Sequence, residues 1–446
     1  MGFLTSSRSI YVLIIIIEVV SVGYIYHKST STIAPKRSWR FLPKPYTAPH
    51  GHNCCNVTNV KSLENGMVTL LQPMIEANCT ALRTGDEREV WTVKKRIKTW
   101  VNTESDGEFL KTLYNCSHIV EEYSNNFYVS PEEENFPLAY ILVVHNNVRQ
   151  VLRLLKVIYR PHNLYCIHPD AKEPNLVEQF LTISRCLVNI FVASKLEKVY
   201  YNHHSIMDAQ LNCMQDLMRL DPSWWRYTIN LCGKELPLKT NREIVHILSK
   251  LNGSSAIDSH EVPQGDRHRF ANKVVLSSGV LRHTKEKIGP VPYGIKIFKS
   301  NNYIAAARPF VSFLLTHKIS IALRKYLQDV TVPEEHFYAT IYKLPDVPGG
   351  PPKDPSVKTD VATCVWMTSP YARHHRQELC KGKIVHHLCI LSSGDLPTVY
   401  RKGVNSPKPI LFFNKYFNSL DHVVMDCMEQ WLVEQNRLEY KHDCLV

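Results

Sequence analysis

The chain of 446 residues lacks the short motifs that identify the commonest nucleotide-dependent and hydrolytic enzymes. It has no GxxxxGK[ST] loop and no GxGxxG turn, which argues against P-loop enzymes and against dehydrogenases with the dinucleotide fingerprint. It has no HExxH and no GxSxG, so neither a zinc metalloprotease nor an α/β-hydrolase is indicated. The absence of any DxD sequence removes one familiar arrangement of metal-binding acids, and the absence of a CxxC pair argues against a cysteine-based zinc site.

The charge pattern argues against a nucleic-acid-binding protein. The 53 basic and 41 acidic residues give a net charge of +12, but the basic residues are dispersed and form no run interleaved with aromatic residues. This excess of positive charge suits a small anionic ligand such as a nucleotide. Hydrophobic residues make up 44% of the chain and charged residues 21%, which is typical of a globular protein with a large core, and there is no internal repeat.

One apolar run, residues 10–26, is close to the length of a membrane-spanning helix. The run is short and contains Glu18, and a cleaved signal peptide is the alternative, but no small-x-small cleavage site follows it. We interpret the run as an uncleaved signal anchor. Basic residues lie on both sides of it, so the charge bias does not decide the orientation of the anchor.

Thirteen cysteines and four N-glycosylation sequons indicate an oxidising, glycosylating compartment. The sequon asparagines are Asn56, Asn78, Asn115 and Asn252. Together with the anchor, these features predict a single-pass type II membrane protein. Its expected segments are a cytosolic tail (1–9), the anchor (10–26), a stem rich in Pro, Ser and Lys (27–53), a disulfide-tied region (54–135) and a lumenal catalytic domain (136–446).

From Leu138 onward, apolar runs of strand length alternate with segments of helical periodicity. The expected strands are LAYILVV, NLYCIH, NIFVA and YTINLC. This alternation predicts an α/β fold with a parallel, helix-covered sheet, in which ligands bind at the carboxyl ends of the strands. His145, His168 with Asp170, and the Cys232–Glu235 turn all follow predicted strands, so each is either a site residue or an ordinary polar loop residue.

The segment TVPEEHFYATIYKL, residues 331–344, places two carboxylates at the start of an apolar, aromatic helix. Pro333 can open that helix, and apolar residues then recur at helical spacing. The helix dipole favours acids in the first turn, which is a structural explanation for Glu334 and Glu335. The alternative is that one of the two is a catalytic base.

Five segments together resemble the core 2/I-branching β-1,6-N-acetylglucosaminyltransferases: LAYILVVHNNVRQVLRLLKVIYRPHNLYCIHPD, NIFVASKLEKVYY, DAQLNCMQDL, INLCGKELPLKTNREIV and VPEEHFYATI. The resemblance extends from about Cys116 to about Leu432. It implies a GT-A-like glycosyltransferase fold with a Rossmann-like nucleotide-binding half, in a single lumenal domain of a Golgi membrane protein. It also implies inverting transfer of N-acetylglucosamine from UDP-GlcNAc in β-1,6 linkage to a galactose- or GalNAc-containing glycan. Metal independence is implied as well, in agreement with the missing DxD.

The resemblance further implies roles for individual residues. Glu335, the second acid of a Pro-acid-Glu motif, matches the family's general base, and Glu334 then remains a helix-start acid. Positions that bind the UDP-sugar are matched by Val143, His145, Asp170, Tyr201, His386 and Lys415. Positions that bind the acceptor are matched by Asp258, Arg269 and Trp366, although Trp366 is also interpretable as a core residue.

The family pattern implies four disulfide bonds. These are Cys116–Cys186, Cys166–Cys213, Cys380–Cys389, and a bond from Cys427 to Cys54 or Cys55. Cys232, in an apolar strand, matches a free thiol, and the pattern leaves Cys79, Cys364 and Cys444 unexplained.

Several positions depart from the family pattern. His386 stands where the family has an arginine that binds diphosphate, and Ser300 replaces a glycine in a stretch where added bulk is expected to crowd the sugar. In the acceptor loop, Asp258 replaces a glutamate and Asp266 replaces a lysine. Because a neutral histidine carries no charge, we expect binding of the donor diphosphate to depend on Lys415 alone. The affinity for the donor should increase as falling pH protonates the histidine.

Two hypotheses of different class remain open from the sequence. The first is an active N-acetylglucosaminyltransferase with altered acceptor choice or rate, and the second is a catalytically silent Golgi homologue that binds glycans or partner transferases. The expected partners are UDP-GlcNAc, an O-glycan or glycoprotein acceptor, and the Golgi membrane through the anchor, with a homodimer left open. No nucleic acid, metal or other cofactor is expected.

Overall fold

The computed structural model describes residues 76–99, 109, 111, 113, 115–124, 128–220, 224–357, 360–367 and 380–445 of the chain. The predicted cytosolic tail, anchor and stem lie outside these residues, and so do Cys54, Cys55 and Asn56. None of the helices that are described is both long enough and apolar enough to cross a membrane.

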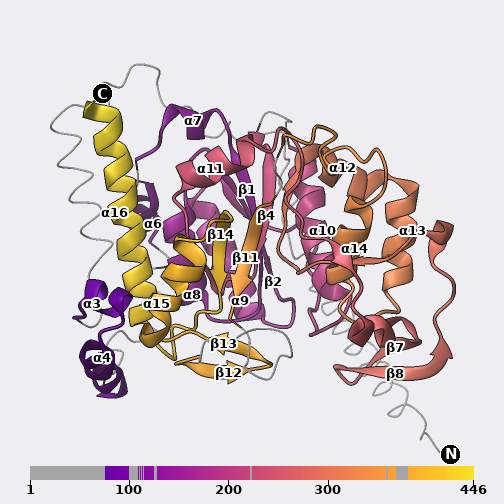
Figure 1. Cartoon of the computed structure of the whole chain (residues 1–446), viewed down its shortest axis with the longest axis horizontal. Helices are drawn as coiled ribbons and strands as arrows, with labels where there is room; N and C mark the ends of the chain where they lie inside the picture. Colours follow the sequence, from indigo (N-terminus) through magenta and orange to yellow (C-terminus); the bar gives the residue numbers. More distant parts are fainter. Residues whose placement is uncertain are drawn as a thin grey trace, which may run out of the picture. The chain divides into compact units, whose positions relative to one another are not determined.

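A five-stranded sheet forms the centre of the domain (Figure 1). Its strands are β1 (Leu138–Val144), β2 (Leu164–Pro169), β3 (Ile190–Val192), β4 (Tyr227–Leu231) and β10 (Ala305–Ala307), in the order β10-β4-β1-β2-β3. The first four are parallel, which confirms the prediction, and β10 joins the edge of the sheet antiparallel to β4. Strand β10 consists of three alanines, which are too few and too uniform to show a strand period in the sequence.

Helices cover both faces of this sheet, and this explains why β1 is an uninterrupted apolar run. All seven residues of β1 are buried. The covering helices are α8 (Val148–Ile158), α9 (Pro174–Cys186), α10 (Ser205–Met218) and α12 (Arg308–Thr316). In Figure 1, α8 lies on one side of the sheet, and α10 and α12 lie on the other.

A second sheet of three short strands was not predicted. It contains β11 (Ala362–Trp366), β14 (Ile410–Asn414) and β5 (Glu235–Pro237) in the order β11-β14-β5. Strand β11 is parallel to β14, and β5 is antiparallel to it. The chain passes from β4 to β5 through a tight turn in which Gly233 has a φ of 78°, and a Cβ there would lie 2.9 Å from Val151. Glycine meets both constraints, so this turn is held against α8.

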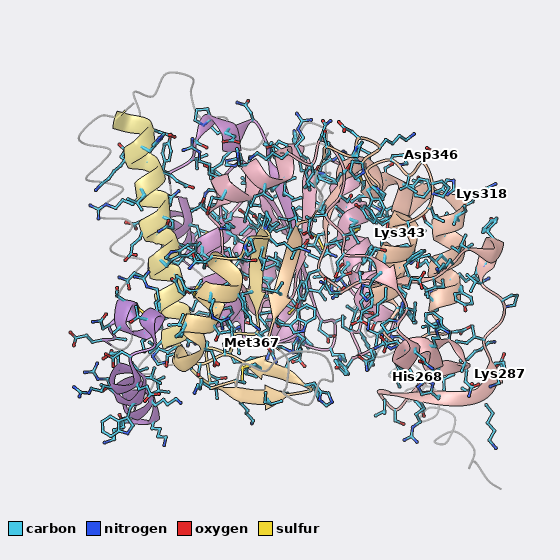
Figure 2. The ribbon with its side chains drawn as sticks, viewed as in Figure 1. His268, Lys287, Lys318, Lys343, Asp346 and Met367 are labelled. Carbon is cyan, nitrogen blue, oxygen red and sulfur yellow. A yellow bond between two sulfur atoms is a disulfide. The ribbon has the colours of Figure 1, made fainter. Side chains whose placement is uncertain are left out.

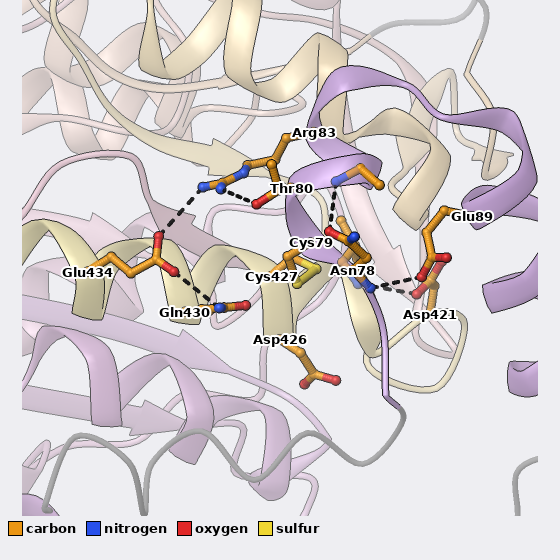
Figure 3. The surroundings of a disulfide bond; sticks show 12 residues. Asn78, Cys79, Thr80, Arg83, Glu89, Asp421, Asp426, Cys427, Gln430 and Glu434 are labelled. Atoms are coloured by element: carbon orange, nitrogen blue, oxygen red, sulfur yellow. Dashed lines mark hydrogen bonds and ion pairs between the residues drawn. A yellow bond between two sulfur atoms is a disulfide. The ribbon is translucent and has the colours of Figure 1, made fainter.

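The first described helix is tied to the last one by a disulfide bond (Figure 3). Helix α3 (Cys79–Thr84) bonds to α16 (Val423–Leu445) through Cys79 and Cys427, and Arg83 forms an ion pair at 3.8 Å with an acid of α16. The prediction that Cys427 pairs with Cys54 or Cys55 is therefore wrong. Pairing depends on which cysteine the fold brings within bonding distance, and sequence spacing does not reveal it.

The other three predicted disulfides are confirmed. Cys116–Cys186 joins α6 (Cys116–Ser124) to the end of α9, Cys166–Cys213 joins β2 to α10, and Cys380–Cys389 closes a short hairpin. Among the cysteines whose side chains are described, Cys232 and Cys364 form no disulfide, and Cys232 was predicted to be free.

The remaining elements complete the domain around the two sheets. They are the helices α4 (Glu87–Thr99), α7 (Pro131–Glu134), α11 (Asn241–Ser249), α13 (Lys318–Leu327), α14 (Glu334–Tyr342) and α15 (Leu396–Val399), and the strand pairs β6 (His260–Glu261) with β9 (Phe298–Lys299), β7 (Asn272–Ser277) with β8 (Val280–Lys287), and β12 (Lys383–Val385) with β13 (Leu388–Ile390). Residues 345–357 contain no helix or strand, as their Pro- and Gly-rich composition predicted. The sequon asparagines Asn78, Asn115 and Asn252 are exposed.

Candidate active site

Residues predicted to bind the nucleotide lie where the parallel strands end. Val143 is the penultimate residue of β1, His145 follows that strand, and Asp170 follows β2. In the register of the two strands Val143 lies opposite His168, so the carboxyl ends are side by side. The backbone N–H of Asp170 donates to the carbonyl of Val144 at 2.8 Å and joins the two strand ends. This is the edge at which open α/β sheets bind their ligands.

Asp170 is buried and holds the next loop in place. Its Oδ1 accepts from the backbone N–H groups of Lys172 (2.9 Å) and Val199 (3.2 Å), and its Oδ2 lies 3.3 Å from the Lys172 ammonium. Val199 belongs to the loop between β3 and α10, which also carries Tyr201. Asp170 therefore positions the loop of a second predicted nucleotide residue.

His168 lies at the same edge, but its role is structural. The side chain is fully buried, and its Nε2 accepts the backbone N–H of Glu197 at 2.9 Å. Burial lowers the pKa of His168 to about 4, although the backbone hydrogen bond and Glu197 act in the opposite direction. The ring is therefore neutral at neutral pH and supports the loop that follows β3.

Tyr201 and His386 come together from distant segments as a stacked pair of rings. Their centroids are 5.4 Å apart with an interplanar angle of 24°, and the Tyr201 side chain is 70% exposed. His386 and His387 form the two-residue turn of the β12–β13 hairpin, with φ values of 47° and 64°. Both predicted donor residues are thus on the surface, where the hairpin tip meets the β3–α10 loop.

The hairpin that carries His386 is attached to the second sheet. The Cys380–Cys389 disulfide closes it, and the N–H of Cys389 donates to the carbonyl of Met367 at 2.9 Å. Figure 2 labels Met367 beside this hairpin, directly after β11. The end of β11 therefore fixes the position of the hairpin at the site.

The second sheet supplies Lys415 and Trp366. Lys415 follows β14, and Trp366, the last residue of β11, lies opposite Asn414 in the register. The Trp366 ring is partly exposed and lies 6.2 Å from the ring of Tyr303. Trp366 is therefore not a fully buried core residue, and its role at the acceptor site stays a prediction.

Glu335, the predicted base, lies in the first turn of α14 and faces two cations. Its side chain is 26% exposed, and its Oε2 accepts from Arg269 at 2.7 Å and lies 3.3 Å from the Lys299 ammonium. Asp266 contacts the same two cations. Burial alone would raise the pKa of Asp266, but Lys299 and Arg269 hold it below its ordinary value. The Glu335 carboxylate is thus oriented by two cations that it shares with a second carboxylate.

Backbone hydrogen bonds place the start of α14 next to the donor-side loop. The N–H of Val332 donates to the carbonyl of Asn202 at 2.8 Å, and Asn202 directly follows Tyr201. The N–H of Ser300 donates to the carbonyl of Glu335 at 2.7 Å. The structure therefore brings the predicted base and the predicted nucleotide loop together from segments far apart in the sequence.

Ser300, the residue expected to crowd the sugar, is turned into the protein. It is 2% exposed, and its hydroxyl donates to the carbonyl of Asn301 at 2.7 Å. The neighbouring Asn302 side chain accepts from Gln210, which in turn accepts from the Tyr338 hydroxyl. The side chains of Ser300, Asn302 and Gln210 therefore form hydrogen bonds within the protein.

Glu334 is not the simple helix-start acid that the sequence predicted. Its side chain is buried, with 4% exposed, and its Oε2 has no hydrogen-bond partner among the described residues. Burial raises the pKa of Glu334 to about 8, and the adjacent Glu335 contributes in the same direction. Glu334 is therefore predominantly neutral at neutral pH, and the favourable term from the helix dipole is outweighed by the loss of hydration.

On the acceptor side, the structure brings Arg269 to the base but leaves Asp258 exposed. Arg269 lies in the 3₁₀ segment Gln264–Phe270, which packs against β7. In Figure 2, His268 of this segment lies close to the β7–β8 hairpin, whose last residue Lys287 is also labelled. Asp258 precedes β6 and forms no ion pair within the described part of the chain.

Lys299 was missed by the sequence analysis, and Lys234 was covered only as part of a candidate turn. Lys299 reaches Glu335 because β9 pairs with β6, and no local pattern reveals that pairing. Lys234 lies in the Cys232–Glu235 turn, which the sequence placed after a strand as either a site feature or an ordinary polar loop. Its position beside Lys415 depends on the second sheet, which was not predicted.

Three carboxylates of the site, those of Asp170, Asp266 and Glu335, are paired with cationic side chains. Asp170 lies against Lys172, and Glu335 and Asp266 share Arg269 and Lys299. Within the described ranges, the single cluster of three potential metal ligands is elsewhere: Cys380, Cys389 and Asp395, whose two cysteines form a disulfide.

Comparison with known proteins identifies the family. The family model described as "Branch: Core-2/I-Branching enzyme" matches residues 138–397, from the start of β1 into α15. A human β-1,3-galactosyl-O-glycosyl-glycoprotein β-1,6-N-acetylglucosaminyltransferase is 32% identical over 389 residues, which cover 83% of this chain and 88% of the relative. A zebrafish (Danio rerio) relative with the same name and the number 4 is 31% identical over 377 residues, covering 82% of this chain and 86% of the relative. The chain therefore belongs to the Core-2/I-branching enzyme family.

Proposed function

We propose that this protein transfers N-acetylglucosamine from UDP-GlcNAc in β-1,6 linkage to a glycan that contains galactose or GalNAc, with inversion at the anomeric carbon. The relatives that cover 83% and 82% of the chain are named as β-1,6-N-acetylglucosaminyltransferases of O-glycosyl glycoproteins. The reaction would add a branch to an O-glycan. Family membership supports the reaction class, and the geometry of the site supports the residues that perform it.

The observation that carries the proposal is the position of Glu335. Its partly exposed carboxylate opens α14 beside Arg269, and the hydrogen bond from Val332 to Asn202 sets this helix start against the Tyr201 loop. A base must lie within hydrogen-bond reach of the proton it removes, and also close to the bound sugar donor. A carboxylate placed between a predicted acceptor residue and a predicted nucleotide loop meets both conditions.

The proposed reaction is a single displacement. Glu335 takes the proton of the acceptor's primary hydroxyl while that oxygen attacks the anomeric carbon of the sugar. The new C–O bond forms as the bond from the anomeric carbon to the diphosphate breaks, and the electron pair of that bond leaves with UDP. Arg269 and Lys299 hold the carboxylate in place for this step.

Charge on the departing diphosphate would be balanced by side-chain cations, with Lys415 at the end of β14 and no divalent metal. The pairing of Asp170, Asp266 and Glu335 with lysine and arginine supports this part of the proposal. The predicted anchor, the exposed sequon asparagines and the four disulfides support a location in the Golgi lumen, with the short N-terminal tail in the cytosol.

The test is transfer to a galactose- or GalNAc-containing acceptor by wild type and by Glu335→Gln. The substitution keeps the shape of the side chain and removes its basicity, so transfer should fall by roughly a hundredfold or more while UDP binding is retained. A wild type that binds UDP-GlcNAc and transfers nothing to a panel of such acceptors would instead support a catalytically silent homologue. Equal turnover by the two proteins would refute Glu335 as the base.

A further inference from the structure

Lys234 is a cation of the site that the proposed function leaves without a role. It lies in the turn between β4 and β5, it is 2% exposed, and its ammonium donates to the side-chain oxygen of Asn146 at 3.0 Å. Asn146 directly follows His145 at the end of β1. The ammonium is therefore directed toward the edge of the sheet at which the predicted nucleotide residues gather.

Lys415 brings a second cation to the same place. The N–H of Tyr416 donates to the carbonyl of Lys234 at 2.8 Å, so the segments that carry the two lysines are directly bonded. The ammonium groups of Lys234 and Lys415 lie 4.7 Å and 5.7 Å from the centroid of one ring, that of Phe417. Burial lowers the pKa of His145, and both ammonium groups lower it further. Two lysines and a histidine thus share one small region.

The backbone holds Lys234 in this position. Gln150 of α8 donates from its side chain to the carbonyls of Gly233 (3.2 Å) and Tyr416 (2.8 Å), and it accepts from the N–H of Asn418 (3.1 Å). Gln150 is 1% exposed. One buried amide therefore fixes both lysine-bearing segments relative to each other.

The carboxylate of the adjacent residue, Glu235, does not pair with either ammonium. Its Oε1 accepts from the thiol of Cys232, the hydroxyl of Tyr303 and the amide of Asn414, at 2.7 to 2.9 Å. Its Oε2 accepts from the backbone N–H groups of Cys232 and Lys234. In the described part of the chain neither Lys234 nor Lys415 forms an ion pair with a carboxylate, and a buried ammonium without a close counterion is unfavourable. Such a pair suits an anion that carries more than one charge.

We infer that Lys234, together with Lys415, binds the diphosphate of the sugar-nucleotide donor and balances the negative charge of the departing UDP. This inference rests on the proposed function. The second cation then comes from the buried β4–β5 turn and not from His386, which lies on an exposed hairpin tip and stacks on Tyr201. As the bond to the anomeric carbon breaks, negative charge grows on the diphosphate oxygens, and two cations already in place require no rearrangement to stabilise it.

The experiment is calorimetric titration of the purified whole protein with UDP and, separately, with uridine. The variants are Lys234→Met, Lys234→Arg and His386→Ala, and Lys239→Met is the matched control. Lys234 precedes β5 and Lys239 follows it. The Lys239 ammonium lies 3.7 Å from Oε1 of Glu243, so its charge is already paired. We expect Lys234→Met to weaken UDP binding by roughly tenfold or more, the effect of losing a charge-assisted hydrogen bond, and to leave uridine binding unchanged. Lys234→Arg should restore most of the affinity for UDP, and Lys239→Met should match wild type.

The outcomes separate this inference from the proposed function. A wild type that binds neither UDP nor uridine would overturn the donor assignment, and the inference with it. If wild type binds UDP no better than Lys234→Met does, the inference alone is overturned. Equal losses of UDP and uridine affinity in Lys234→Met would indicate a folding defect and would also overturn the inference. Tight UDP binding that depends on His386 and low pH, and not on Lys234, would restore the histidine as the second cation.

Discussion

Glu334 and Glu335 are adjacent in sequence, yet their replacement by glutamine should affect different properties. Glu334→Gln should change how stability depends on pH, and Glu335→Gln should remove sugar transfer. Glu334 is buried with a pKa of about 8, whereas its ordinary value is 4.5. Both the folded and the unfolded chain hold this proton below about pH 4.5. As the pH rises above that value, the unfolded chain releases the proton and the folded chain retains it until about pH 8. The free energy of unfolding should therefore fall throughout this window.

The magnitude follows from the width of the window. Each pH unit costs about 1.4 kcal/mol while only the unfolded state is ionised, so the rise from pH 5 to pH 8 should cost wild type on the order of 4 kcal/mol from this one group. Glutamine has a similar shape and does not titrate. Glu334→Gln should accordingly lose less stability than wild type between pH 5 and pH 8, while it transfers sugar normally at pH 6 to 7.

The assay is urea unfolding of wild type, Glu334→Gln and Glu335→Gln at pH 5, 6, 7 and 8, with disulfides intact. The difference between each variant and wild type cancels the contributions of the other titrating groups. Glu335→Gln is included for comparison of activity, since it should remove transfer whereas Glu334→Gln should not. Parallel pH slopes for wild type and Glu334→Gln would refute the claim that burial keeps Glu334 protonated.

Three further predictions test other parts of the structure. Transfer activity should be the same with and without EDTA, because Asp170, Asp266 and Glu335 are each paired with lysine or arginine, and inactivation that a divalent metal reverses would contradict this. Replacing both Cys79 and Cys427 by serine should lower the free energy of unfolding by about 2–4 kcal/mol, and peptide mapping of wild type should recover these two cysteines in one bridge; a bridge from Cys427 to Cys54 would refute the pairing. Arg269→Gln should lower kcat/KM for the acceptor by roughly tenfold or more with UDP binding unchanged, and a loss of UDP affinity alone would place Arg269 on the donor side instead.

The main sheet was predictable because its strands are buried on both faces. The run from Leu138 to Val144 is apolar throughout, and an amphipathic helix follows it, so period and order together predict a parallel sheet. Strand β10 and the second sheet were not predictable in this way. Ala305–Ala307 and Glu235–Pro237 have three residues each, and their pairing is decided by distant segments.

In the candidate site, too, features with a local sequence pattern were predictable and features that depend on distant segments were not. The positions of Asp170 after β2 and of Glu335 in the first turn of α14 were predictable from the strand and helix patterns, whereas the roles of these residues and of Lys415 are implied by the family resemblance and stay predictions. The burial of Glu334 was not, because the helix-start argument considers the backbone dipole and not what packs against the side chain. The partner of Cys427 and the placement of Lys234 beside Lys415 likewise depend on segments that meet only in the folded domain.

The Cys79–Cys427 disulfide can form only late in the synthesis of the protein. The two cysteines are 348 residues apart, so the bridge cannot close until almost the whole domain has been made. At a synthesis rate of about 5–20 residues per second, Cys427 is added roughly 20 to 70 s after Cys79. Cys79 is also the middle residue of the Asn78-Cys79-Thr80 sequon, and the Asn78 side chain caps α3 by accepting the N–H of Ala81 in the finished fold. In the proposed lumenal location, Cys79 is not yet bridged to α16 during that interval, which gives a glycosylation enzyme time to modify Asn78 before α16 is synthesised.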